Sequence, residues 1–177
     1  MTPDEVLDFW FSAESQARWF DSTPAFDETI RTRFNGLYEQ AATGGMNWPK
    51  TPKSALAHVI VLDQFPRNMF RNTARAFATD HLAFDVSRRA VDRGFDADMT
   101  VPQRQFLYMP FMHTEDLAAQ DRGLVLYEAL GDANVLDFMK KHHAIIAKFG
   151  RFPYRNAMLG RDSTPEEQAS DEIKNPF

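Results

Sequence analysis

Apolar side chains recur every three or four positions along most of the chain, which is the spacing of amphipathic helices. The clearest stripe predicts a helix across residues 26–38, with apolar positions at Phe26, Ile30, Phe34, Leu37 and Tyr38. The segment Ser54–Leu62 is apolar on nearly every side, so it predicts a helix at the centre of the molecule. Between these two segments, Gly44-Gly45 and two prolines interrupt the chain.

Threonine signals mark where further helices are expected to begin. Thr2 and Thr164 each precede a proline and two acidic residues, which combine a cap, a first-turn proline and charges that the helix dipole favours. More starts are expected at Thr79, Thr100 and Thr114. Pro110 is expected to end the helix that begins at Thr100, because proline inside a helix lacks a backbone donor.

The last long helices are expected at residues 114–131 and 135–149, and the second ends at Gly150. His142 falls on the apolar stripe of that helix and should face the core or a pocket, whereas His143 lies off the stripe and should face solvent. Strand signals are scarce, because no alternating run of β-branched residues lies between hairpin turns. The chain is therefore predicted to be all-α, with antiparallel helical pairs in a single domain.

Aromatic residues are abundant, with 16 phenylalanines in 177 residues. The pairs Trp10-Phe11 and Trp19-Phe20 could form a surface that stacks on nucleic-acid bases, but helical spacing and a net charge of −5 favour packing in the core. The same negative charge argues against nucleic acid or an anionic membrane as a partner.

The absence of cysteine excludes disulfide scaffolds, cysteine zinc sites, thiol nucleophiles and iron–sulfur clusters. No apolar run approaches the roughly 18 residues of a membrane span, and the acidic N-terminus is unlike a secretory signal. A soluble, cytoplasmic protein is expected. Glycine-rich phosphate loops, the GxSxG elbow and the HExxH zinc helix are all missing from the sequence, so no cofactor and no metal are expected.

The first candidate polar site is LDQFPRNMFR at residues 62–71. Asp63 follows an almost wholly apolar helix, where an unpaired polar group is costly. In a functional site, Asp63 would be a general base or an orienting carboxylate, and Arg67 would clamp an anion. The alternative is a buried Asp63–Arg67 ion pair that holds the end of the helix in place.

The second candidate is YMPFMHTEDLAAQ at residues 108–120. His113 lies at the junction of two helices and could titrate near neutrality, although junction histidines more often cap a helix or bond a carboxylate. Glu115 and Asp116 are explained by the helix dipole, which favours acids in a first turn. Metal ligation by these three residues is disfavoured, because adjacent acids on a helix point in different directions.

The third candidate is HHAIIAKFGRFPYRN at residues 142–156. Arg151 and Arg155 flank a Phe-Pro turn that can hold both guanidinium groups in fixed directions for a carboxylate or phosphate. The alternative is that they cap helix carbonyls or pair with nearby acids. The turn also echoes Phe65–Asn68 about half a chain earlier, and helical repeat proteins show such self-similarity.

Motifs with a recognisable order run along nearly the whole chain. They are VLDFWF at 6–11, RWFD at 18–21, LDQFPRNMFR at 62–71, RAFATD at 75–80, YMPFMHTEDLAAQ at 108–120 and FGRFPYRNAMLGRDSTPEE at 149–167. This set resembles the bacterial family called domain of unknown function 924. The resemblance implies a tetratricopeptide-like, right-handed stack of helices, and it implies no activity or ligand.

Two departures from that family's pattern bear on function. Tyr154 stands where the family motif usually has histidine, so an essential acid–base role at this position is in doubt, whereas a structural role survives the change. The last segment, residues 168–177, lacks an apolar ending. A helical domain is therefore expected over residues 1–167, followed by a frayed C-terminal tail.

The leading hypothesis is a pocket, lined by arginine and histidine at the helix ends, that binds a small anionic metabolite or an acidic peptide end. Its ligand-binding residues would be Arg67, Asn68, His113, Arg151, Tyr154, Arg155 and Asn156. The first alternative is an enzyme, a hydrolase or transferase, whose candidate catalytic residues are His113, Glu115, His142 and Asp63. The second alternative is a protein-interaction scaffold, and the sequence leaves the oligomeric state open.

Overall fold

Every regular element is helical within residues 1–174, the part of the chain that this computed structural model describes. The α-helices are α1 (Pro3–Trp10), α2 (Ala13–Gln16), α3 (Pro24–Ala42), α4 (Pro52–Val59), α5 (Phe65–Met69), α6 (Asp80–Asp92), α7 (Val101–His113), α8 (Leu117–Glu128), α9 (Ala133–Phe149), α10 (Asn156–Leu159) and α11 (Pro165–Gln168). A π-helical turn joins α4 to α5 at Ile60–Gln64, and 3₁₀ turns lie at Ala74–Phe77, Pro153–Arg155 and Asp171–Ile173. The all-α prediction is confirmed, and α1 and α3 to α9 share one main hydrophobic core.

Most of the threonine signals begin helices as expected. Thr2, Thr100 and Thr164 each form a capping box, in which the hydroxyl accepts from the N–H three residues on and that residue's side chain accepts from the threonine N–H. Thr79 precedes α6, but its hydroxyl donates instead to the carbonyl of Leu62, 2.6 Å away. This threonine therefore ties the start of α6 to the central helix.

The predicted central helix is buried, and it extends beyond its predicted end through the π turn into α5. Pro66 has no N–H for the carbonyl of Leu62, which an unbroken α-helix would bond at this spacing. The Thr79 hydroxyl satisfies that carbonyl, and a guanidinium nitrogen of Arg67 donates to the carbonyl of Asp63 at 2.6 Å. These replacement bonds let the helical run continue past the proline, so Asp63 stays on a fully buried segment.

The prediction that Pro110 ends a helix is wrong, because α7 continues through it to His113. A proline inside a helix loses one backbone hydrogen bond. The turn that contains it is buried, however, since Phe111 is fully enclosed and Met112 is 6% exposed. Packing of this turn outweighs the local penalty, and it carries His113 to the end of α7 before Asp116 caps α8.

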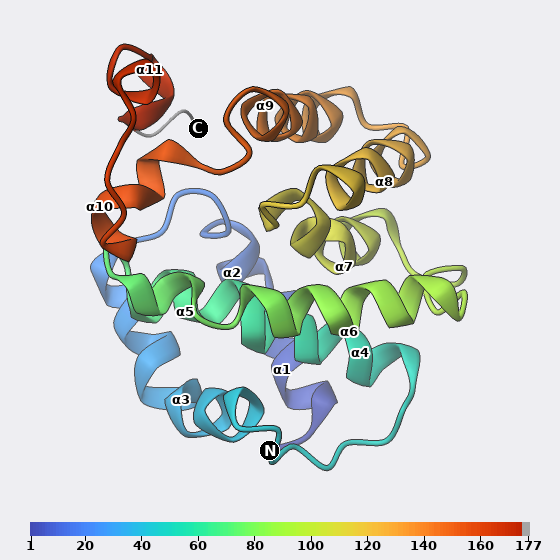
Figure 1. The fold of residues 1–177 in the computed structure, drawn as a ribbon. Coiled ribbons are helices and arrows are strands. Elements are labelled where there is room, and N and C mark those ends of the chain that lie inside the picture. The colour runs from blue at the N-terminus through green and yellow to red at the C-terminus, as the bar shows by residue number, and fades with distance from the viewer. Residues whose placement is uncertain (175–177) are drawn as a thin grey trace.

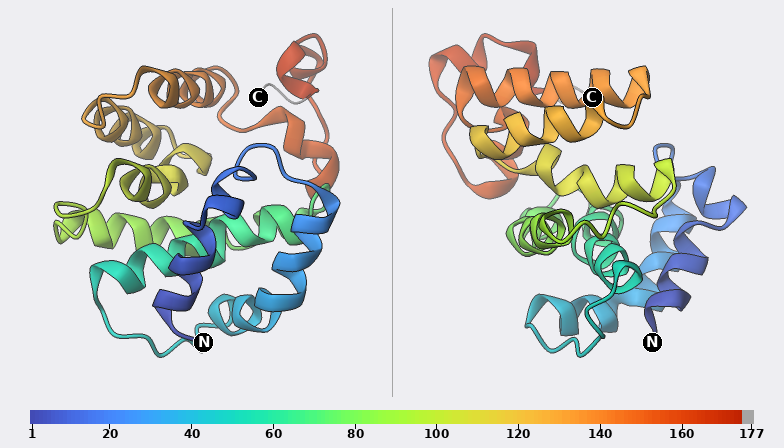
Figure 2. Two further views of the ribbon diagram at one scale, coloured as in Figure 1. Left: turned by 180° about the vertical axis from the view of Figure 1, so that it is seen from behind. Right: turned by 90° about the vertical axis from the view of Figure 1, so that its right-hand side faces the viewer.

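Helices α7, α8 and α9 form one layer, and each runs antiparallel to the next (Figures 1 and 2). Tyr127, near the end of α8, donates to the carbonyl of Gln105 near the start of α7 at 3.1 Å. His143 of α9 bonds Asp121 near the start of α8 at 2.7 Å. Because α8 is antiparallel to both neighbours, α7 and α9 run in the same direction.

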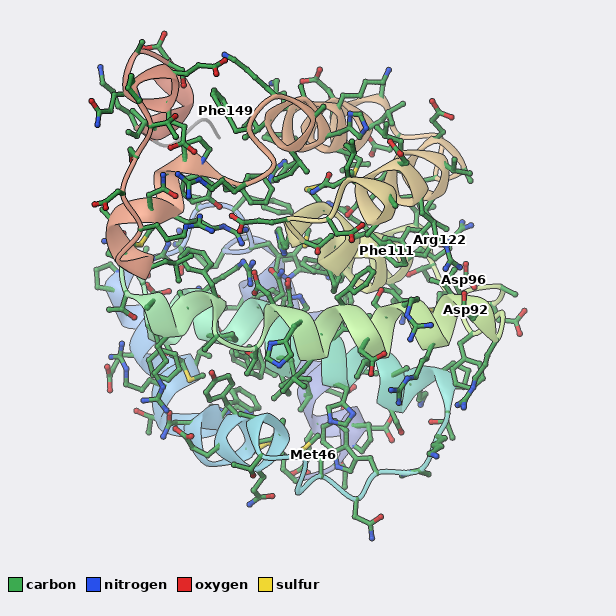
Figure 3. All side chains as sticks on the ribbon, in the orientation of Figure 1. Met46, Asp92, Asp96, Phe111, Arg122 and Phe149 are labelled. Carbon is green, nitrogen blue, oxygen red and sulfur yellow. The ribbon has the colours of Figure 1, made fainter. Side chains whose placement is uncertain are left out.

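Helix α6 lies against this layer, and the C-terminal segment folds back beside it (Figure 1). Figure 3 shows Arg122 of α8 between Asp92 of α6 and Phe111 of α7, 2.6 Å from the Asp92 carboxylate and 5.5 Å from the Phe111 ring centre. This contact fastens the layer to α6.

The tetratricopeptide-like handedness of the stack and the fraying of residues 168–177 remain predictions, and residues 175–177 lie outside the described part. Within residues 1–174, no helix is long and apolar enough to cross a membrane.

Candidate functional site

A cavity of about 650 Å³ opens between α5, α7 and α9. The loop between α2 and α3 contributes Trp19, Phe20 and Ser22 to its wall, and the 3₁₀ turn after α9 contributes Tyr154. Cavities of this size hold small molecules. The cavity also gathers several of the helix ends at which the sequence analysis placed its candidate residues.

Asp63 lies behind the cavity wall, fully buried in the π turn, where three neighbours contact its carboxylate. Its Oδ1 is 2.7 Å from Nδ1 of His113, and its Oδ2 accepts from the amide of Gln64 at 2.5 Å. A guanidinium nitrogen of Arg67 lies 3.3 Å from Oδ1. His113, Gln64 and Arg67 all line the cavity, so three partners of one buried carboxylate belong to its wall.

The charges in this cluster determine the protonation of His113. Burial by itself raises the pKa of Asp63, but the charges of Arg67 and His113 and the hydrogen bonds to the carboxylate hold that pKa well below its ordinary value. Burial and the Arg67 charge lower the pKa of His113, against the opposing effect of Asp63. At pH 7 the pair is therefore an ionised carboxylate and a neutral imidazole.

A neutral His113 that donates from Nδ1 to Asp63 carries its lone pair on Nε2. Within residues 1–174 no group bonds this second nitrogen, and it is not enclosed by protein. Because His113 is part of the cavity wall, Nε2 is presented to the cavity as a hydrogen-bond acceptor. A ligand hydroxyl or a water molecule can donate to it there.

His142 lies beside this pair, with its ring centre 6.1 Å from that of His113. Its Nδ1 donates to the carbonyl of Phe138 at 2.8 Å within α9. Burial and the neighbouring His113 lower the pKa of His142 to about 3, so this imidazole is also neutral. The side chain faces the core and the cavity as predicted, whereas His143, predicted to be exposed, is half-buried.

The two Phe-Pro motifs meet on Asp80 at the start of α6. Arg67 donates to both carboxylate oxygens of Asp80 at 2.8 and 2.9 Å, and Arg155 donates to one of them at 3.1 Å. Arg155 is 4% exposed, and its guanidinium lies 4.6 Å from the ring centre of Phe77 and 4.4 Å from that of Phe152. Both positive charges are therefore balanced within the protein, and of the two only Arg67 lines the cavity.

Tyr154, the departure from the family motif, joins the cavity wall to this ion pair. Its hydroxyl accepts from Nε of Arg155 at 3.1 Å, and its ring lies edge-on to Phe77 with centres 6.4 Å apart. A histidine at this position could accept the same bond through a ring nitrogen. The residue thus orients a buried arginine while it contributes to the wall.

Glu115 does not line the cavity, because it anchors the C-terminal segment to the start of α8. It forms a two-pronged ion pair with Arg161 at 2.6 and 3.0 Å and accepts from the N–H of Phe152 at 2.8 Å. Burial raises its pKa, but the bonds from Arg161 and Phe152 outweigh that effect and lower it, so Glu115 stays ionised. Both oxygens of the Glu115 carboxylate therefore accept hydrogen bonds within the protein.

Arg151 and Asn156 also lie away from the cavity wall, in a second cluster around Glu167. Arg151 donates to both oxygens of Glu167 at 2.6 and 2.8 Å, and the amide of Asn156 donates at 3.1 Å. Hydrogen bonds from Arg151 and from the Thr164 N–H lower the pKa of Glu167 to about 2. This cluster holds α11 against the turn that follows α9.

Asn68 and Arg71 line the cavity and bind Asp27 of α3. The amide of Asn68 donates at 2.7 Å, Arg71 donates at 3.0 and 3.1 Å, and the hydroxyl of Ser22 donates at 2.6 Å. Burial raises the pKa of Asp27, but these bonds outweigh it and lower the pKa. The arrangement fixes the loop between α2 and α3 against α5, and so fixes one side of the cavity.

The structure brings together part of the predicted set. The predicted residues that line the cavity are Arg67, Asn68, His113, His142 and Tyr154. Asp63 and Arg155 lie directly behind them, each bonded to a lining residue. The remaining ones, Glu115, Arg151 and Asn156, belong to the C-terminal clusters. Whether any of them binds a ligand stays a prediction.

The apolar wall of the cavity was not predicted from the sequence. Trp19 and Phe20 were expected in the core, yet Phe20 is 73% exposed at the cavity. Met109 and Phe138 also line it, and each stands four positions before a cavity histidine on its own helix. That spacing was the available signal, because residues four apart share a helix face.

Among the described residues, no group of three or more histidine and carboxylate side chains could hold a metal ion.

The model of a family described as bacterial protein of unknown function (DUF924) matches residues 6–170. The solved structure of a protein of unknown function from Agrobacterium tumefaciens is similar over 94% of both chains, with 40% identity and a TM-score of 0.88. No curated protein matches the chain.

Proposed function

This chain belongs to the DUF924 family of bacterial proteins of unknown function, and we propose that its cavity processes a small molecule with His113 as general base. The observation that carries the proposal is the 2.7 Å contact between Nδ1 of His113, which lines the cavity, and the fully buried Asp63. A buried carboxylate on one imidazole nitrogen selects the tautomer that accepts a proton on the other. The reaction class is hydrolysis or group transfer.

The proposed step uses groups that are already in position. A water or substrate hydroxyl gives its proton to Nε2 of His113, and its oxygen attacks an electrophilic carbon or phosphorus. The bond to the leaving group breaks, and the leaving group takes the proton from Nε2. Asp63 stabilises the imidazolium that exists between these two transfers, since its carboxylate is ionised at pH 7.

His113→Asn tests the base against a purely structural role. The asparagine amide can occupy the place of Nδ1 and still donate to Asp63, but it has nothing at the place of Nε2. We expect wild-type protein to hydrolyse members of a panel of p-nitrophenyl esters and phosphates, and the variant to be about 10²- to 10⁴-fold slower. Since the pKa of His113 lies below 6.5, activity should persist below that pH and fall in more acidic solution.

The matched control is His143→Asn, because His143 also contacts an aspartate, Asp121, at 2.7 Å but lies outside the cavity. Its rate should equal that of the wild type. Equal rates for wild type and His113→Asn, including equally absent rates, contradict the proposal. So does a nitrogen NMR spectrum that places the proton of neutral His113 on Nε2.

A second candidate function is recognition of a small anionic metabolite or an acidic peptide end, favoured by Arg67 and Arg71 at the wall. Both arginines already pair with aspartates, so an anion would have to share them with Asp80 and Asp27. For that reason the anion site ranks below the general-base site. The interaction scaffold ranks lower still, because the polar candidates converge on a cavity. We still expect this protein to have a tetratricopeptide-like stack of helices and to be cytoplasmic.

A further inference from the structure

Two rows of side chains line the cavity, and they repeat one order of chemistry: amide, apolar, imidazole. The row on α7 is Gln105, Met109 and His113. The row on α9 is Asn134, Phe138 and His142. Members of each row stand four residues apart, which places them on one face of their helix.

The two rows run side by side in the same direction, because α7 and α9 are both antiparallel to α8. Their histidines are neighbours, with ring centres 6.1 Å apart. From Gln105 to His113 the row is about 12 Å long at the helical rise of 1.5 Å per residue. Exposure increases along α9 from 6% at His142 to 46% at Phe138 and is high at Asn134. Along α9 the cavity wall is therefore most enclosed at His142 and open at Asn134.

The middle of the cavity is apolar. Met109 and Met112 are each 6% exposed there, and Val135 is half-buried. Methionine side chains are unbranched and adapt to the shape of an alkyl chain. At the rim, Phe20 is 73% exposed, and its ring stacks parallel to that of Phe106 with centres 6.5 Å apart. An exposed aromatic ring beside an apolar cavity is typical of a binding site.

We propose that the substrate is an ester or thioester of an unbranched aliphatic acid, with its carbonyl at His113 and its chain along the rows toward Phe20. This proposal rests on the general-base role of His113. A water proton passes to Nε2 of His113 while the water oxygen bonds to the carbonyl carbon. The bond to the leaving oxygen or sulfur then breaks, and the leaving group takes the proton from Nε2, which yields a free carboxylic acid and an alcohol or thiol.

An aliphatic chain suits these walls better than a sugar or a nucleotide. Met109, Met112 and Val135 offer hydroxyl-rich ligands almost no hydrogen-bond partners. A phosphate-bearing ligand would have to displace Asp80 from Arg67, which binds that carboxylate at 2.8 and 2.9 Å. Transfer of methylene groups from water to such a surface is favourable without any directional contact.

The test uses the acid products as binding probes on the full chain. Calorimetric titration with butanoate, hexanoate and octanoate should show Kd falling about fourfold for each added methylene. The branched isomer 2-propylpentanoate has the same composition as octanoic acid in its acid form and controls for shape. It should bind at least tenfold more weakly than octanoate, because a branch does not fit between two parallel rows.

Phe138→Asn places a polar group at the apolar position of the α9 row. Phe138 is partly exposed, so folding should tolerate the change. It should remove most of the dependence of Kd on chain length. The control is Val125→Asn, which changes a 66% exposed apolar residue outside the cavity and should leave that dependence intact. A Kd that is independent of chain length in the wild type, or a chain-length dependence that survives Phe138→Asn, overturns the proposal.

The failure of this proposal can be told from the failure of the general-base role. His113→Asn should keep the chain-length dependence of binding while it loses hydrolysis of p-nitrophenyl octanoate. Chain-length dependence without any wild-type hydrolysis supports the aliphatic site and contradicts the base. Hydrolysis that depends on His113 but proceeds equally for acetate and octanoate esters supports the general-base role and contradicts the aliphatic site.

Discussion

The two Phe-Pro motifs, Phe65–Asn68 and Phe152–Asn156, begin from nearly the same sequence and take different places in the molecule. Their arginines bind the same carboxylate, that of Asp80. Their asparagines each donate to an acid, Asp27 for the first motif and Glu167 for the second. The first motif nevertheless forms part of the cavity wall, whereas the second contributes only its tyrosine.

The difference comes from the element that precedes each motif. A π turn carries the central helix past Pro66, so the first motif projects its side chains from a continuous helical run. Gly150, with φ at 69°, ends α9 in the left-handed conformation before Pro153 starts a short 3₁₀ turn. The second motif therefore folds back on the C-terminal segment. A motif supplies the groups, and the preceding backbone decides where they point.

Asp80→Asn should have the largest effect, because it removes the charge that the two motifs share. Arg155, 4% exposed, is then a buried guanidinium without a carboxylate, which typically costs about 3–5 kcal/mol of unfolding free energy. Urea unfolding measures the change. Asp85→Asn on the same helix is the control, since Asp85 is 40% exposed and its surface ion pairs contribute about 0–1 kcal/mol. Equal losses of unfolding free energy in Asp80→Asn and Asp85→Asn would contradict the role of Asp80 as the shared partner of the two motifs.

Glu115→Gln should have the next largest effect, and it should act on the second motif alone. The amide oxygen can still accept from Phe152, but the charge opposite Arg161 is lost, which costs roughly 1–3 kcal/mol of unfolding free energy. Octanoate binding should not change, because Glu115 does not line the cavity. Glu128→Gln, at an exposed position at the end of α8, controls for the substitution. A loss of binding in Glu115→Gln would show that the two regions are coupled.

Acid titration should separate the cavity from the second motif by pH. The folded protein keeps His142 neutral down to about pH 3, while the unfolded chain takes up that proton below 6.5, so stability falls from pH 6.5 toward 3. Glu167 is ionised down to about pH 2 when folded, so its stabilisation is complete above 4.5 and is lost as pH falls toward 2. His142→Gln should flatten the upper window and Glu167→Gln the lower one.

Thermal unfolding in buffers from pH 7 to pH 2 records both windows. The two variants should differ from the wild type in different parts of the profile. Identical profiles for His142→Gln and Glu167→Gln would mean that neither group titrates as its surroundings require.

Arg71→Met should give the smallest change in stability, and Arg151→Met is its counterpart at the second motif for the binding measurement. Arg71 is 51% exposed, and loss of its ion pair with Asp27 should cost about 0–1 kcal/mol. Arg151→Met should leave octanoate binding unchanged, because Arg151 contacts Glu167 away from the cavity. Arg71→Met should weaken the binding of carboxylate probes, and more so at low salt. Calorimetry decides, and an equal effect on binding from both variants contradicts the distinction between the motifs.

Much of the fold could be predicted because its signals are local. The capping boxes at Thr2, Thr100 and Thr164 need only residues within one helical turn, and the stripe over residues 26–38 needs only one helix face. The failure at Pro110 shows the limit of such signals. Whether a proline ends a helix depends on how well the turn around it is buried, and burial is a property of distant neighbours.

The sequence by itself determined the all-α class, most helix starts and the list of polar residues worth attention, since cap chemistry and apolar spacing act over a few positions. Only the tertiary structure decided their partners. It joined His113 to Asp63, which is 50 residues away, and bound both Phe-Pro arginines to Asp80. It also turned Glu115 and Arg151 away from the cavity. The physical reason is that a buried charge must find its counter-charge across the core, and no local pattern records which one it will meet.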